Sequence, residues 1–153
     1  MAYLKIALPA FTVIGIAGSS DDGEGFVHRV WDEANRRFGE VAGIAKYNEQ
    51  GQPAVWGLMS DMGMGFRPWE DGFSKGRYLA GVEVEDDAVA PEGWEKWVSP
   101  AYEYIVAPQD GPDAFHRAIS WLTGNGMHLA GAAYDRIMPG TDGFIFLPIR
   151  KII

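Results

Sequence analysis

The sequence predicts an α+β fold built from two similar halves, each with the order strand–helix–strand–strand. Three observations carry this prediction: two amphipathic helical patterns far apart in the chain, short β-branched and aromatic runs around each of them, and short sequence matches that occur in the same order in both halves. The 153 residues suit one compact domain, and 47% of them are apolar. A chain of this composition offsets its ordering entropy by burial, so intrinsic disorder is not expected.

Two segments carry apolar residues at the three-to-four spacing of one helical face, and they run from about Glu24 to Val41 and from about Gly111 to Leu122. Asp22 and Asp110 are the expected N-caps, because their carboxylates can accept hydrogen bonds from first-turn N–H groups. The apolar positions are Phe26, Val27, Val30, Trp31, Ala34, Phe38 and Val41 in the first segment and Phe115, Ala118, Ile119 and Leu122 in the second.

Six further segments are short, rich in β-branched and aromatic residues, and bounded by Gly, Pro or Asp, which is typical of strands. They are Phe11–Ala17, Ala54–Met59, Tyr78–Val84, Tyr102–Ala107, Leu129–Ile137 and Phe144–Ile149. Several are apolar on both faces. We therefore expect helices on one face of an antiparallel sheet, while the other face is covered or forms a cleft.

An internal repeat relates the two halves. The matching pieces, in the same order in both, are Pro9–Phe11 with Pro100–Tyr102, Phe26–Arg29 with Phe115–Arg117, and Gly57–Asp61 with Gly131–Asp135. We predict two modules within one domain, residues 1–88 and 94–153, that pair edge strands across a pseudo-two-fold axis and leave a central ligand cleft.

Composition excludes several kinds of function. The net charge is −8, which argues against a surface that binds nucleic acid directly. The chain has no Cys, so disulfides, thiolate catalysis and Cys-ligated metals are excluded. His28, His116 and His128 show no metal-ligand spacing, and no cofactor motif is present. Met1–Ile6 does not read as a signal peptide and no apolar run reaches membrane-span length, so a cytoplasmic protein is expected.

The sequence resembles the GyrI-like small-molecule-binding domain, the effector-binding domain of bacterial transcription activators, over nearly the whole chain. The matching stretches are Pro9–Phe11, the Glu24–Phe38 helix, Arg77–Val84, Pro91–Trp94, Ser99–Tyr104, Trp121–Leu122, Tyr134–Asp135 and Phe146–Lys151. The resemblance implies two tandem β-α-β-β modules around a cleft that binds hydrophobic, often cationic, compounds. The first strand of the domain opens the chain, so the resemblance implies a stand-alone member without a helix-turn-helix reader.

Glu83 is the first candidate site residue, because it lies in an otherwise apolar strand on the same face as Leu79 and Gly81. A buried carboxylate needs a partner, or its pKa rises. In the cleft that the resemblance implies, Glu83 would attract a cation or act as a general acid or base. The alternative is an edge-strand Glu at a solvated end of the sheet.

Tyr134 and Asp135 match an aromatic–acid pair that contributes to the pocket in the family. Neighbours on a strand point to opposite faces, so we expect Tyr134 in the cleft and Asp135 beside a turn with Arg136. Aromatic side chains suit flat lipophilic cations through stacking and cation–π contact, although core packing accounts for many of them. The predicted ligand-binding residues are Glu83, Trp56, Trp69, Tyr104, Tyr134 and Phe146.

The sequence favours binding of a hydrophobic, cationic or aromatic small molecule, for sequestration or sensing. One alternative is a hydrolase of strained, cyclopropane-type toxic compounds with Glu83 as general base and Tyr134 as its hydrogen-bonding partner. The other is a protein that interacts with gyrase or with a regulator. The Met- and Gly-rich stretch Ser60–Gly76 is the candidate lid over the cleft.

Overall fold

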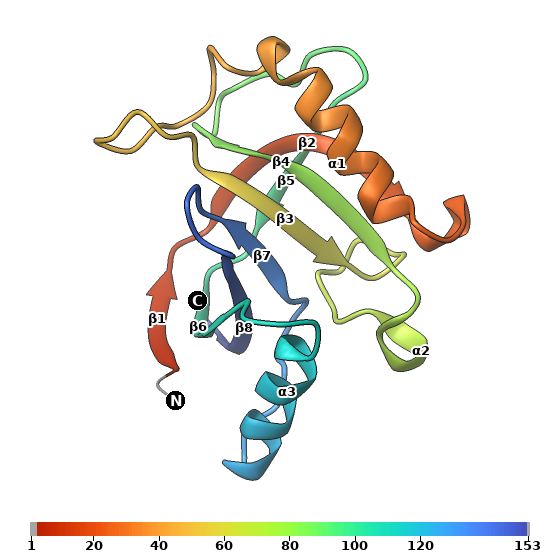
Figure 1. Cartoon of the computed structure of the whole chain (residues 1–153), viewed down its shortest axis with the longest axis vertical. Coiled ribbons are helices and arrows are strands. Elements are labelled where there is room, and N and C mark those ends of the chain that lie inside the picture. Colours follow the sequence, from red (N-terminus) through yellow and green to blue (C-terminus); the bar gives the residue numbers. More distant parts are fainter. Residues whose placement is uncertain (1–2, 153) are drawn as a thin grey trace.

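A single eight-stranded antiparallel sheet forms the centre of the molecule (Figure 1). The computed structural model describes residues 3–152. The strands are β1 Leu4–Leu8, β2 Phe11–Ser19, β3 Val55–Ser60, β4 Arg77–Val84, β5 Glu95–Ser99, β6 Tyr102–Pro108, β7 Tyr134–Ile137 and β8 Phe144–Lys151. The α-helices are α1 Phe26–Arg36, α2 Glu70–Phe73 and α3 Ala114–Gly124, and short 3₁₀ turns cover Ser20–Asp22 and Phe38–Glu40.

The two halves of the sheet repeat one topology about the β3–β7 pair, which we call the seam. Moving outward from the seam, one half runs β3, β4, β2, β5 and the other runs β7, β8, β6, β1. The outermost strands are exchanged: β1 pairs with β6, and β5 pairs with β2. Each half therefore contains the predicted strand–helix–strand–strand unit together with a strand that precedes the other unit in the chain.

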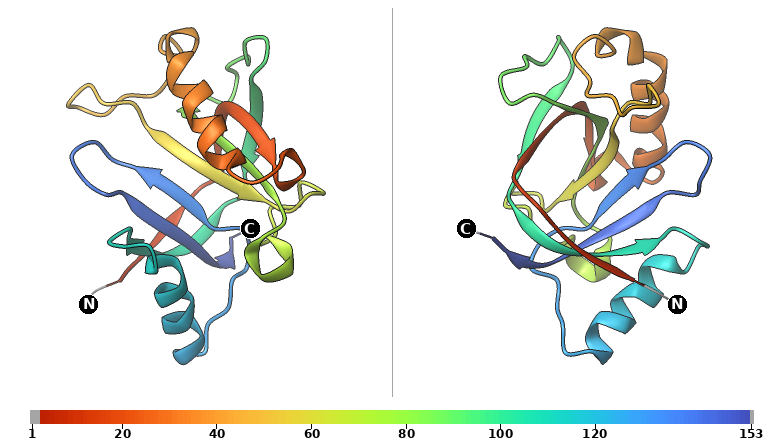
Figure 2. Two further views of the ribbon diagram at one scale, coloured as in Figure 1. Left: turned by 45° about the vertical axis from the view of Figure 1, so that its right-hand side comes forward. Right: turned by 90° about the vertical axis from the view of Figure 1, so that its left-hand side faces the viewer.

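Alternation along the strands gives the sheet two different sides. On the helix side, α1 and α3 cover two separate apolar clusters, one in each half. The opposite side, which we call the inner side, carries a third, strongly aromatic cluster formed by both halves. Figure 2 shows the sheet bent strongly, with α1 and α3 outside the bend. The prediction of an antiparallel sheet with helices on one face is confirmed.

Four local predictions differ from the structure. The edge strands β1 and β5 were not expected, because their exposed, charged positions hide the strand pattern. The predicted strand Leu129–Ile137 is regular only from Tyr134. Asp22 caps the 3₁₀ turn before α1 instead of α1 itself, since its carboxylate accepts from the backbone N–H of Ser19 at 2.8 Å.

The second expected cap also has another partner, because the Asp110 carboxylate pairs with the guanidinium of Arg117. Within residues 3–152, no helix is both long and apolar enough to span a bilayer. The same residues contain no cluster of three or more His, Asp or Glu side chains arranged to hold a metal ion.

Candidate functional site

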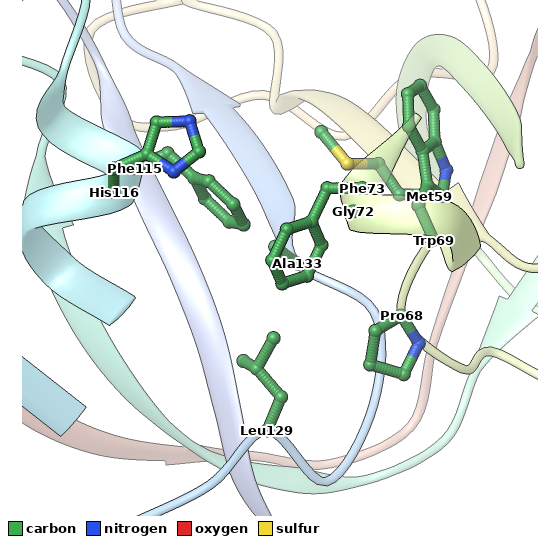
Figure 3. A pocket seen from close by; sticks show the side chains of 9 residues that line it. All are labelled: Met59, Pro68, Trp69, Gly72, Phe73, Phe115, His116, Leu129 and Ala133. Atoms are coloured by element: carbon green, nitrogen blue, oxygen red, sulfur yellow. The ribbon is translucent and has the colours of Figure 1, made fainter. Parts of the chain in front are cut away.

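A cavity of about 200 Å³ opens on the helix side of the seam, between α2 and α3 (Figure 3). Its walls are almost entirely apolar, and four of its residues are aromatic or imidazole rings. The lining residues are Met59, Pro68, Trp69, Gly72, Phe73, Phe115, His116, Leu129 and Ala133. The second half of the chain supplies Phe115, His116, Leu129 and Ala133, and the first half supplies the other five lining residues, so the cavity belongs to neither half alone.

Phe73 and Phe115 bring the two halves together over this cavity. Their rings meet edge to face with centroids 5.0 Å apart. Figure 3 shows both rings projecting toward the space above Ala133, with Met59 behind them. Trp69 is held more firmly, because its indole N–H donates to the carbonyl of Arg77 at 2.9 Å and its ring stacks on Phe26.

A chain of hydrogen bonds crosses the seam beside the cavity. The Trp31 indole N–H donates to the Tyr78 hydroxyl at 3.1 Å, and that hydroxyl donates to Asp135 Oδ2 at 2.7 Å. Asp135 lies opposite Gly57 in the β3–β7 register. Gly57 and Met59 are two residues apart on β3 and share a face, so Asp135 is on the same side of the sheet as the cavity residue Met59.

The Asp135 carboxylate has an unusual electrostatic environment. Burial raises its pKa above the ordinary range, and the hydrogen bond from Tyr78 lowers it only in part. Burial and the nearby Asp135 charge raise the pKa of Tyr78 well above 10. No Lys, Arg or His among residues 3–152 makes an ion pair with Asp135. The Asp135 carboxylate therefore has no basic partner among residues 3–152, and it follows the cavity residue Ala133 by two positions in the chain.

Five of the six predicted site residues lie together on the inner side of the sheet. The ring centroids of Trp56 and Phe146 are 5.0 Å apart, and that of Tyr104 lies 5.5 Å from Phe146 and 6.1 Å from Tyr134. These four side chains are at most 8% exposed. The hydroxyl of Tyr134 shares a hydrogen bond of 2.8 Å with Ser99, while the buried Tyr104 hydroxyl has no partner among the described residues.

Glu83 lies at the rim of this inner aromatic cluster, and its charge is already matched. Its Oε1 accepts from the Trp56 indole N–H at 3.0 Å, and its Oε2 is 3.6 Å from Lys46 Nζ. The Arg136 guanidinium covers the Trp56 ring, with its central carbon 5.2 Å from the ring centroid. Protein cations thus occupy the positions at which a ligand cation would meet Glu83 and Trp56.

The predicted residues therefore do not form one site. Trp69 lines the helix-side cavity, whereas Glu83, Trp56, Tyr104, Tyr134 and Phe146 lie across the sheet from it. We expected Tyr134 to face the cleft. In the structure Asp135 lies on the same side of the sheet as the cavity, whereas Tyr134 is packed in the inner aromatic cluster.

Sequence reasoning did not assign Phe73, Phe115 or the hydroxyl of Tyr78 to a site. The Gly at position 57 was a signal, because an added Cβ there would collide with the Tyr78 hydroxyl.

The candidate lid is anchored near its start by Asp61, and it has residues with uncommon backbone conformations both there and in α2. Asp61 Oδ1 accepts from the N–H groups of Gly65 and Arg67, at 2.7 and 3.2 Å. Burial raises the pKa of Asp61, but these backbone hydrogen bonds outweigh burial and leave it below the ordinary value. Four non-Gly residues of the segment have positive φ, namely Met64, Phe66, Asp71 and Phe73. Such conformations are uncommon for side-chain-bearing residues.

No family model and no curated protein matches the chain. Three solved structures match it over almost its full length. SAV2435 bound to tetraphenylphosphonium is 15% identical, with 98% of this chain and 94% of that chain covered and a TM-score of 0.63. The EcmrR C-terminal domain is 13% identical, with 99% and 100% covered and a TM-score of 0.64. An integron cassette protein from the mobile metagenome of Vibrio cholerae is 12% identical, with 99% and 97% covered and a TM-score of 0.55. At these identities the similarity shows a shared fold, and the fold is the one that the resemblance to GyrI-like domains implies.

Proposed function

We propose that this protein binds a hydrophobic small molecule that carries a positive charge, in the helix-side cavity with Asp135 as the charge partner. One observation carries the proposal: the apolar cavity with aromatic walls includes Ala133, two residues before Asp135, and the Asp135 carboxylate has no basic partner among residues 3–152. Apolar pockets with a few convergent polar groups are the usual form of small-molecule sites. A cation over aromatic rings and beside a carboxylate gains both cation–π and ionic attraction.

The comparisons support the same class of ligand. A structure with the same fold, SAV2435, is described as bound to tetraphenylphosphonium, a lipophilic cation. Binding without catalysis would suit sequestration or sensing. The inner aromatic cluster with Glu83 is the competing location, but Lys46 and Arg136 would first have to leave.

The test is a titration of intrinsic Trp fluorescence with lipophilic cations of different sizes, each paired with a neutral molecule of the same shape. The variants are Asp135→Asn and, as a matched control from the other side of the sheet, Glu83→Gln. We expect saturable binding of at least one cation, weakened at least about tenfold by Asp135→Asn and unchanged by Glu83→Gln, because removing one partner of a desolvated ion pair costs several kcal/mol.

If Glu83→Gln weakens cation binding and Asp135→Asn does not, the ligand binds on the inner side of the sheet. Product analysis accompanies each titration, since consumption of a ligand would indicate a hydrolase. Failure of every cation and neutral compound to bind would contradict the proposal and favour a protein partner.

A further inference from the structure

We propose that the cavity, as it stands, selects cations with one aromatic ring on a short chain, that is, arylalkylammonium ions, and that Phe73 and Phe115 set this size limit. This inference rests on the proposed function and names its ligand class. It follows from the volume of the cavity, from the position of the charge relative to it, and from the way in which each wall is held.

The volume fits one ring. An apolar cavity of about 150 Å³ holds a benzene molecule, whereas sites for drug-sized ligands occupy about 300–1,000 Å³. The cavity between α2 and α3 measures about 200 Å³. It therefore accommodates a single ring with a short substituent, and a cation with four phenyl rings exceeds it.

The position of the carboxylate sets the length of the substituent. A ring above Ala133 lies two residues along the chain from Asp135, on the same side of the sheet. Ala133 immediately precedes β7, and two residues of chain span at most about 7 Å, a separation that an ammonium on a chain of two or three carbons can bridge. Asp135 Oδ2 accepts from Tyr78, and Oδ1 has no side-chain donor among the described residues, so Oδ1 is the oxygen left for the ammonium.

The walls differ in how easily they move. Met59 is on β3 and Ala133 immediately precedes β7, so both lie on the floor of the cavity. Trp69 is fixed by its hydrogen bond to Arg77 and by its stacking on Phe26. Phe73 is different, because it is 36% exposed, has a φ of 64° and is held over the cavity by its contact with Phe115. Shortening Phe73 should therefore enlarge the cavity without disturbing the floor or Asp135.

The experiment compares affinities by calorimetric titration. The ligands are phenethylammonium, its neutral counterpart 2-phenylethanol, and tetraphenylphosphonium. The proteins are the wild type, Phe73→Ala, Asp135→Asn, and the control Tyr47→Ala, which removes an exposed ring far from the cavity. Phe73→Leu provides a milder truncation if Phe73→Ala loses its native circular dichroism spectrum.

In the wild type, we expect phenethylammonium to bind at least about tenfold more tightly than either 2-phenylethanol or tetraphenylphosphonium. Phe73→Ala or Phe73→Leu should raise the affinity for tetraphenylphosphonium relative to phenethylammonium by about tenfold, and Tyr47→Ala should leave the ratio unchanged.

Two outcomes separate the size limit from the proposed function. If the wild type prefers tetraphenylphosphonium and Asp135→Asn weakens both cations, the size limit is wrong and the proposed function stands. If Asp135→Asn changes neither cation's affinity, the proposed function itself is wrong, and the inference fails with it.

Discussion

The Tyr78 hydroxyl reaches Asp135 across an intervening strand, since Tyr78 is on β4, Asp135 is on β7 and β3 runs between them. The crossing is possible because position 57 of β3 is Gly, and a Cβ there would occupy the place of the hydroxyl. One hydrogen bond thus connects the two halves on the helix side and fixes a carboxylate beside the cavity.

Gly57→Ala should displace Tyr78 and break this hydrogen bond. A buried hydroxyl and carboxylate that lose their partner cost about 1–3 kcal/mol, and overpacking adds to that, so we expect a loss of about 2 kcal/mol or more in the free energy of unfolding. Urea unfolding of the variant and the wild type measures this loss. Gly43→Ala is the matched control, because an added Cβ there meets no atom within 4 Å. If Gly57→Ala and Gly43→Ala are equally stable, the Tyr78 hydroxyl does not reach Asp135 over Gly57.

Asp135 should make stability depend on pH in a particular direction. Its pKa is raised in the folded state by burial, so the ionised form is penalised at neutral pH and the penalty is relieved as the pH falls through the folded pKa toward the ordinary value. Asp135→Asn removes the ionisation. We expect Asp135→Asn to gain free energy of unfolding, relative to the wild type, when the pH is raised from 4 to 7. Urea unfolding at both pH values measures this difference. Asp87→Asn, at an exposed position, should show no such change.

Glu40 should act in the opposite sense. The hydrogen bonds that it accepts from Arg37 and Trp94 lower its pKa to about 2. A carboxylate of this kind contributes stability above its unfolded pKa and loses the contribution as the pH falls toward 2. Thermal unfolding of Glu40→Gln should therefore show a lower Tm than the wild type at pH 7 and a difference that shrinks below about pH 4.5. If the Tm difference between Glu40→Gln and the wild type stays the same from pH 7 to below pH 4.5, the lowered pKa of Glu40 is wrong.

Asp71→Gly should stabilise the lid segment. Asp71 has a φ of 52° and is exposed, and Gly adopts this conformation without the steric cost that a side chain brings. We expect a gain of about 0.5–1 kcal/mol in the free energy of unfolding. Asp87→Gly, on another exposed loop, serves as the comparison and should bring no gain. Loss of stability in Asp71→Gly would show that the side chain itself supports the segment.

The sequence predicted α1, α3, the inner strands and the twofold repeat because each has a strong local pattern, whereas the short helix α2 was not predicted. Phe26, Val30 and Ala34 recur along one face of α1, and they pack as their spacing predicts. The edge strands were not predicted, since positions such as Glu95 and Lys96 face solvent and their strand conformation depends on pairing with β2.

The candidate site was less predictable for a related reason. Alternation placed Tyr134 and Asp135 on opposite sides, but only the three-dimensional arrangement shows which side holds a cavity. Glu83 stood out in its strand, yet its partners Lys46 and Trp56 come from distant parts of the chain. Local sequence reveals which residues are unusual, whereas the charges that neutralise them are assembled by tertiary contacts.

The exchange of β1 and β5 has a consequence for the way in which the protein is made. During synthesis β2 is in place early, but its edge partner β5 follows only after residue 94, and β1 waits for β6. The first half therefore leaves the ribosome with an open sheet edge at β2, and the second half completes its part of the sheet with β1 from the other end of the chain. The cavity takes Phe115, His116, Leu129 and Ala133 from the second half, so a chain cut between the halves would lack these walls.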